Sequence, residues 1–205
     1  QIKRNILNIK DSDIAKNSCI IHLAAITDFG YCEKHPEQCH TVNVMGTQKI
    51  LEIARKKNCS LIFASTSHVY AIPHKLPIKE THPIHPNSVY SQSKISAEKL
   101  CEAYSKSYGL DITVLRLFSV YGPRSSEHKV ESSIITQLLS NRTVKIGNLY
   151  PKRDFIYKDD AIRAFQIAIK NLKNFNIYNI GSERSYSIQE IYNILKKLSG
   201  KKNPV

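Results

Sequence analysis

Short apolar runs rich in β-branched residues alternate along this chain with longer runs whose apolar residues recur at helical spacing. This alternation is typical of βαβ units, so it predicts an α/β fold built on a doubly wound parallel sheet. The predicted buried strands are residues 19–25, 60–65, 112–118 and 176–180. The predicted helices are residues 41–57, 88–108, 129–140 and 159–171, and a last one that begins with a capping box at Ser187-Ile-Gln-Glu190 and ends at Gly200.

Glycine is scarce, and its placement bears on cofactor binding. A dinucleotide-binding sheet of this kind begins with a strand, a G-x-x-G-x-x-G turn and a helix whose N-terminus binds the pyrophosphate. The chain has 7 glycines and no such cluster, and Gly30, the first of them, follows a run that already looks like a fourth strand. Either the protein binds no dinucleotide, or the sequence lacks the opening βαβ units.

The charge and hydropathy of the chain bear on whether it binds nucleic acid or a membrane. The net charge of +13 can reflect nucleic acid, an anionic small molecule or a lysine-rich proteome. The lysines are spread over the polar positions of the predicted helices, so we expect no nucleic-acid partner. The apolar runs are far shorter than the roughly 20 residues that a membrane span needs, and we expect a cytoplasmic protein with no membrane partner.

The five cysteines form no CxxC pair, which argues against a zinc knuckle or a disulfide framework. Cys32 and Cys39 lie near His35 and His40, and this is the one cluster that resembles a ligand set. Its spacing fits no common zinc template. We predict no metal site, and a surface loop that leads through Pro36 into a helix.

Two Tyr-x-x-x-Lys pairs occur, Tyr90 with Lys94 and Tyr192 with Lys196. On a helix this spacing puts the ammonium one turn from the phenol, where it can stabilise a phenolate. In a chain this rich in both residue types about one such match is expected by chance, so the motif alone carries little weight. Tyr90 follows a helix start, whereas Tyr192 lies among apolar residues of an amphipathic helix and is predicted to be a packing residue.

Polar residues follow several predicted strands, at the edge where doubly wound sheets bind their ligands. They are Thr27, Asp28, residues 65–68, Ser119 and residues 181–183. Hydroxyl groups at these strand ends favour a binding site there.

Together with the pair Tyr90 and Lys94, a series of ordered segments resembles the extended short-chain dehydrogenases that act as NAD-dependent nucleotide-sugar epimerases and dehydratases. The similar segments are His22-Leu-Ala-Ala25, Asn43-Val-Met-Gly-Thr47, Phe63 to Tyr70, Ser88-Val-Tyr-Ser-Gln-Ser-Lys94, Leu115 to Arg124, Arg153 to Asp160 and Tyr178-Asn-Ile-Gly181. The resemblance implies a Rossmann-like sheet that lacks its first βαβ units, with a small partial substrate-binding lobe. It also implies NAD as cofactor and a nucleoside-diphosphate sugar as substrate.

The resemblance implies catalytic roles for Thr66, Tyr90 and Lys94. Tyr90 as phenolate would take the proton of a sugar hydroxyl, Lys94 would lower its pKa and hold the nicotinamide ribose, and Thr66 would orient the hydroxyl. The implied cofactor contacts are Ala24, Ala25, Asn43, Ser65, Tyr90, Lys94 and Phe118. The implied substrate contacts are Thr27, Ser67, His68, Ser119 and Arg153, of which Arg153 would bind the diphosphate.

The resemblance leaves the reaction open between two types. In 4,6-dehydratases with a Thr in this loop a carboxylate follows two residues later, where this chain has His68, which favours epimerisation. Ser119 stands where many members have Asn. Residues 133–153, in contrast, look most like a branch that contains dehydratases. We expect an epimerase first, a 4,6-dehydratase as the alternative, and a catalytically silent subunit as a third hypothesis.

We expect residues 1–118 and 155–181 to form an incomplete NAD-binding domain, and residues 119–154 and 182–205 a partial sugar-nucleotide lobe. The sequence would then be incomplete at both ends, and these 205 residues alone would show no NAD-dependent turnover. Family members usually pair through the helices equivalent to residues 41–57 and 88–108, which implies a homodimer.

Overall fold

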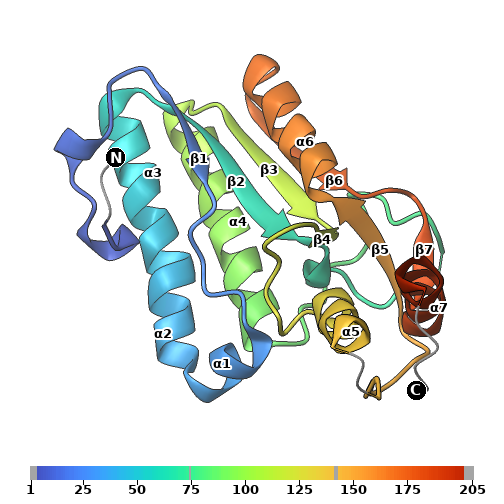
Figure 1. The fold of residues 1–205 in the computed structure, drawn as a ribbon. Coiled ribbons are helices and arrows are strands. Elements are labelled where there is room, and N and C mark those ends of the chain that lie inside the picture. The colour runs from blue at the N-terminus through green and yellow to red at the C-terminus, as the bar shows by residue number, and fades with distance from the viewer. Residues whose placement is uncertain (1–3, 74, 141–142, 201–205) are drawn as a thin grey trace. The chain divides into compact units, whose positions relative to one another are not determined.

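A computed structural model describes residues 4–73, 75–140 and 143–200 (Figure 1). The chain divides into two compact units, residues 1–117 with 163–180 and residues 118–162 with 181–205. Residues 155–162, which we expected in the first domain, therefore belong to the second unit. The roles expected for the two parts stay predictions.

The first unit contains a four-stranded sheet in which every neighbouring pair is parallel. Its order is β1 (Cys19–His22), β2 (Ser60–Thr66), β3 (Ile112–Leu117) and β6 (Phe175–Ile180). All four strands were predicted as a parallel set, and the α/β class is confirmed. The first strand is shorter than expected, because it ends at His22 and residues 23–25 continue without sheet pairing.

Helices flank this sheet on both faces (Figure 1). On one side lie α3 (Gly46–Lys57) and α4 (Val89–Tyr108), which share an apolar core with Leu61 and Phe63 of β2. On the other side α6 (Lys158–Lys170) packs Phe165 and Ala168 against Ile62. Neighbouring residues of β2 thus point to opposite cores, as strand geometry requires. The helix α4 ends at Gly109, whose φ of +67° is the left-handed conformation expected there.

The chain is helical from Phe29 to α3, which corrects one prediction. It forms α1 (Phe29–Lys34), α2 (Pro36–His40) and a π-helical turn (Thr41–Met45) that continues into α3. Cys32 and Cys39 are both 0% exposed. The expected surface loop is therefore wrong, because each thiol is buried on a short helix. The many polar residues around Cys32 and Cys39 did not indicate this burial. The remaining short elements of this unit are 3-10 turns at Ile6–Asn8, Asp11–Asp13 and Ser67–Val69.

The second unit has its own small sheet and core. Its strands are β4 (Ser119–Tyr121), β5 (Lys152–Tyr157) and β7 (Ser185–Ser187), in the order β4-β5-β7. Its helices α5 (Val130–Leu139) and α7 (Ile188–Ser199) pack together through Ile134, Leu138, Ile188 and Tyr192. Tyr192 is 2% exposed, so its predicted packing role is confirmed. The capping box that opens α7 is also present.

Asp154 organises one turn of the second unit. Its carboxylate accepts hydrogen bonds from the backbone N–H groups of Ser182 and Glu183 and from the Ser182 hydroxyl, at 2.8–2.9 Å. A Cβ at Gly181 would lie 2.6 Å from the same carboxylate, so a side chain there would displace Asp154 from these hydrogen bonds. Asp154 of the Arg-Asp-Phe segment thus contacts the turn that begins at Gly181, the last residue of the Tyr-Asn-Ile-Gly segment. Among the described helices, none combines the length and the hydropathy that a membrane span requires.

Candidate active site

The carboxyl end of β2 carries the first candidate residue, Thr66. The strand stops there, and the Thr66 hydroxyl caps the 3-10 turn Ser67–Val69 by accepting a 3.2 Å hydrogen bond from the backbone N–H of His68. Thr66 is 6% exposed. Its hydroxyl is thus held at the sheet edge where polar residues were predicted to gather.

The other two candidate catalytic residues, Tyr90 and Lys94, lie near the start of α4. Ser88 caps the helix in a capping box with Ser91, which fixes the first turn and the directions of Tyr90 and Lys94. Tyr90 is 7% exposed and Lys94 is 4% exposed. The Thr66 side chain lies close enough to the Tyr90 hydroxyl to offer it a hydrogen bond. The structure therefore brings Thr66 and Tyr90 together, from elements that are far apart in the sequence.

Burial sets the acid-base properties of this pair. It raises the pKa of Tyr90 to about 12, although the hydrogen bond from Thr66 acts in the opposite direction. Burial also lowers the pKa of Lys94 to about 8. The Lys94 ammonium lies 4.2 Å from the centroid of the Phe63 ring and has no hydrogen bond to a described residue. Each group is therefore held in its neutral form more firmly than in water, so activation of Tyr90 requires additional positive charge beside it.

Aromatic rings border Tyr90 on the side of α1. The Phe29 ring lies 5.0 Å from the Tyr90 ring and 4.9 Å from the His68 ring, measured between centroids. Phe29 is 39% exposed, and His68 is exposed as well. The sequence did not single out Phe29, since an aromatic residue at the start of a short polar helix gives no signal by itself.

Asn43 fixes the segment that follows β1. It is 1% exposed, and its amide nitrogen donates to the Ile26 carbonyl and to the Ser93 hydroxyl, both at 2.9 Å. Its side-chain oxygen accepts from the Ile26 N–H at 2.7 Å. Asn43 thus joins this segment to α4 one turn from Tyr90. Its amide is engaged within the protein, and the cofactor contact expected for Asn43 stays a prediction.

His22, at the end of β1, lies under the same site. Its Nε2 is 2.9 Å from the Thr47 hydroxyl, which itself donates to the Asn43 carbonyl at 2.6 Å. Since the only proton of that hydroxyl is already used, His22 Nε2 must be the donor. Burial and the Lys94 charge lower the pKa of His22 to about 4, so the ring is neutral at pH 7.

The other predicted site residues divide between the two units. In the first unit Ala24 and Thr27 are exposed, Ala25 and Ser67 are partly exposed, and Ser65 is buried. In the second unit Phe118 and Ser119 are partly exposed and Arg153 is exposed. These three belong to a different unit from Thr66, Tyr90 and Lys94, and their roles stay predictions.

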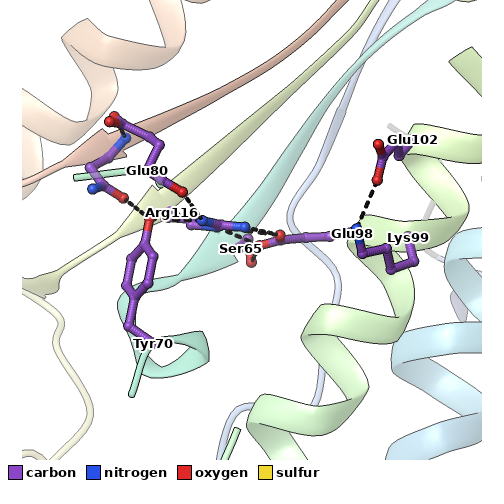
Figure 2. Close-up of polar contacts among 8 residues, drawn as sticks. Ser65, Tyr70, Glu80, Glu98, Lys99, Glu102 and Arg116 are labelled. Atoms are coloured by element: carbon purple, nitrogen blue, oxygen red, sulfur yellow. Dashed lines mark hydrogen bonds and ion pairs between the residues drawn. The ribbon is translucent and has the colours of Figure 1, made fainter. Parts of the chain in front are cut away.

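Sequence reasoning missed a buried polar cluster next to the site (Figure 2). It centres on an ion pair between Arg116 of β3 and Glu98 of α4, and Ser65 and Tyr70 bind to it. A signal was present: Arg116 interrupts an otherwise apolar strand, and a buried charge must be paired. Glu98 is one helical turn after Lys94, a position that could have suggested the partner.

The arrangement supports one kind of chemistry. A buried phenol with a hydroxyl neighbour and a buried ammonium on the same helix can exchange a proton with an alcohol and orient it. Among the described residues, no group of three or more His, Cys, Asp or Glu side chains could hold a metal ion.

Comparison with known proteins agrees with this geometry. The model of the NAD dependent epimerase/dehydratase family matches residues 6–181. The chain is 35% identical over 196 residues to a putative UDP-glucose 4-epimerase of Methanocaldococcus jannaschii, covering 93% of this chain and 62% of that protein. Across the curated relatives it matches, the chain spans between 45% and 65% of their length.

Two solved structures illustrate the range of activities among similar folds. UDP-glucuronic acid 4-epimerase from Bacillus cereus, in complex with UDP-glucuronic acid and NAD, is 34% identical with a TM-score of 0.90, covering 99% of this chain and 66% of that chain. A dTDP-glucose 4,6-dehydratase from Streptomyces venezuelae, with NAD bound, is 27% identical with a TM-score of 0.84, covering 90% and 58%.

Proposed function

Because this chain belongs to the NAD-dependent epimerase/dehydratase family, we propose that it is part of a nucleoside-diphosphate-sugar 4-epimerase, which inverts one sugar carbon through transient oxidation and reduction. The observation that carries the proposal is that the buried Thr66 and Tyr90 side chains lie next to each other, with the buried Lys94 one helical turn from Tyr90.

Each of the three residues has a distinct part in the proposed mechanism. Tyr90 takes the proton of the sugar hydroxyl during oxidation and returns it during reduction. Thr66 accepts or donates a hydrogen bond at the same hydroxyl and orients it toward Tyr90. Lys94 supplies positive charge that favours the phenolate, which must offset the burial that raises the pKa of Tyr90 to about 12.

The described residues fit the nicotinamide-ribose end of NAD. The Lys94 ammonium is buried without a hydrogen bond to a described residue, so it has donors left for a ribose hydroxyl. Ala24 and Ala25 follow the carboxyl end of β1 without bulky side chains, and Ser65 lies near the carboxyl end of the neighbouring strand β2. When bound, NAD supplies the reversible oxidation of the sugar carbon.

Other residues are assigned to the substrate. Arg153 is exposed and can offer two parallel donors to a diphosphate, and Ser119 offers a short hydroxyl donor. Thr27, Ser67 and His68 follow strands of the first unit and are assigned to the sugar.

Epimerisation is favoured over dehydration because neither the loop after Thr66 nor the buried Glu98 offers a carboxylate to the sugar. Removal of water from the sugar needs an acid-base group beside the reacting carbons in addition to Tyr90. Among the described residues, Glu98 is the only buried Asp or Glu, and its two oxygens already bind Arg116 and Ser65. The residues that follow Thr66, Ser67-His-Val-Tyr70, include no carboxylate either.

The test uses the full natural chain that contains these residues, purified and incubated with UDP-, dTDP- and GDP-sugars. Mass spectrometry and NMR would follow the products. A product of unchanged mass with inverted C4 supports the proposal. A product lighter by one water would establish the 4,6-dehydratase instead, and no conversion with any sugar would favour a catalytically silent subunit.

We also propose that the natural protein is a homodimer that pairs through α3 and α4. Light scattering of the same preparation at micromolar concentration would show twice the chain mass, and a monomer would contradict the proposal.

A further inference from the structure

Arg116 and Glu98 form a buried ion pair (Figure 2). Arg116 is 2% exposed and Glu98 is 3% exposed. The guanidinium Nη2 donates to Glu98 Oε2 at 2.6 Å, and its Nε donates to both carboxylate oxygens at 3.1 and 3.3 Å. The contact is a two-pronged one, which fixes the orientation of the two side chains as well as their separation.

Two further side chains bind to this pair from either side of Thr66. The Ser65 hydroxyl, one residue before Thr66, donates to Glu98 Oε1. The Tyr70 hydroxyl, just after the 3-10 turn, accepts from Arg116 Nη1 at 2.7 Å. The short segment that carries Thr66 is therefore anchored at both of its ends to one ion pair.

The same ion pair is rigidly connected to the catalytic helix. Glu98 lies on α4 one turn after Lys94 and two turns after Tyr90. Arg116 lies on β3, which pairs with β2 next to Ser65. The ion pair thus joins the strand that presents Thr66 to the helix that presents Tyr90, and these are the two hydroxyl groups that meet in the site.

Stability alone does not explain a buried ion pair. The desolvation cost of two charges is comparable with their attraction, and well-packed apolar residues often serve the fold as well. The surroundings here are apolar: Arg116 follows Ile112 and Val114 on the face of β3 that packs against α4. What apolar residues cannot supply is a set of directed bonds to Ser65 and Tyr70.

We infer that Glu98 and Arg116 are positioning residues, which hold the Thr66 hydroxyl in register with the Tyr90 hydroxyl. The inference deepens the proposed function and rests on it for its catalytic meaning. Neither residue touches the reacting atoms, and they act through Ser65, Tyr70 and α4.

The first measurement does not depend on activity. In the full natural chain with ¹³C-labelled tyrosine, the Cζ signal of Tyr90 is identified by its loss in Tyr90→Phe. Thr66→Val, which removes the hydroxyl partner, gives a reference displacement of that signal. The paired substitution Glu98→Leu with Arg116→Met is expected to displace it in the same direction. Glu102→Gln is the matched control, because Glu102 lies one turn further along α4 and binds only Lys99 and Lys106 at the surface.

The second measurement applies to the enzyme once a substrate is known. The paired substitution should lower kcat by about 10²-fold, the scale of a misplaced catalytic group, with KM changed by less than about 3-fold. An unmoved Tyr90 signal, or a moved signal with unchanged kcat, would overturn the inference. If the wild-type protein converts no nucleotide sugar, the proposed function fails, and the Tyr90 signal still decides whether the pair positions Thr66.

Tyr70→Phe provides a milder variant in case the paired substitution does not fold. It removes only the hydroxyl that accepts from Arg116. The Tyr90 signal should shift in the direction of Thr66→Val by a smaller amount, and kcat should fall by about 3- to 10-fold. A variant that matches the wild type in both measurements would count against the inference.

Discussion

Tyr90 with Lys94 on α4 and Tyr192 with Lys196 on α7 share one spacing but have different surroundings. Both tyrosines are buried, at 7% and 2% exposure. The lysines differ: Lys94 is 4% exposed, whereas Lys196 is partly exposed, with its ammonium 5.5 Å from the centroid of the Tyr192 ring. Burial of the lysine, rather than the motif or the burial of the tyrosine, therefore separates the candidate catalytic pair from the packing pair.

The burial of Lys94 has an energetic cost that the partly exposed position of Lys196 avoids. A buried ammonium is unfavourable, and for Lys94 this appears as a pKa lowered to about 8. A protein gains nothing in stability from such a group, so its presence indicates another use. The pair on α7 follows the ordinary rule, with the ring in the core and the charge near the solvent.

The largest expected effect is on activity. Tyr90→Phe in the full natural chain should lower kcat by about 10³-fold, because it removes the proposed proton acceptor while keeping the ring. Steady-state assays with the substrate identified above would measure it. Tyr192→Phe is the matched control and should keep kcat within about 2-fold. Equal losses in the two variants would refute the distinction between the pairs.

The next effect concerns stability, and here the larger loss is expected at Tyr192 rather than at Tyr90. Tyr192→Ala should lower the free energy of unfolding by about 3–5 kcal/mol, the usual cost of removing a buried aromatic ring. The ring packs with Ile134, Leu138 and Ile188, so the cavity would open within the core of the second unit. Urea unfolding followed by circular dichroism would measure the change. A loss below about 1 kcal/mol would mean that this core repacks around the gap.

Lys94→Met should abolish activity and still stabilise the fold at pH 7. The folded pKa of about 8 lies below the ordinary value of 10.5, so the folded state bears a penalty while the lysine is charged. The unfolded state then binds more protons between pH 8 and 10.5, and stability from this group rises with pH across that window. The full penalty corresponds to roughly 3 kcal/mol, and we expect a gain of about 1–3 kcal/mol in the variant.

The measurement for Lys94→Met is the difference in unfolding free energy between variant and wild type from pH 7 to pH 10. That difference should shrink as pH rises above 8. The range stops at pH 10 because Tyr90, whose pKa is raised by burial, makes stability fall above that pH. A constant difference would show that the Lys94 ammonium is solvated.

The sequence predicted the sheet of the first unit more fully than that of the second. The runs at β2, β3 and β6 are apolar and lie inside the sheet or against a helix, so their composition reveals them. The strand β5 begins Lys152-Arg-Asp and pairs with two strands of three residues each. Such short, polar strands form because a neighbouring strand is available, which a local pattern cannot show.

The candidate site was predictable only in part. Tyr90 and Lys94 are four residues apart, so their shared helix face follows from local geometry, and the meeting of Thr66 with Tyr90 came from the resemblance. The connection of Ser65, Glu98 and Arg116 spans three elements, and only the fold brings them together. The same holds for Cys32 and Cys39, which are buried because two short helices turn inward near Tyr90.

The smallest effect tests whether the two Lys→Met substitutions change the free energy of unfolding in opposite directions. Lys196→Met should lower the free energy of unfolding by about 0.5 kcal/mol, because it removes a cation over the Tyr192 ring and a positive charge from the last turn of α7. Lys94→Met, the same substitution at the same spacing from a tyrosine, is expected to raise it. Denaturant titration of both variants at pH 7 and low ionic strength would measure the two signs side by side. If both variants lose stability, the buried ammonium of Lys94 is compensated within the fold, and the argument that its burial marks a function would fail.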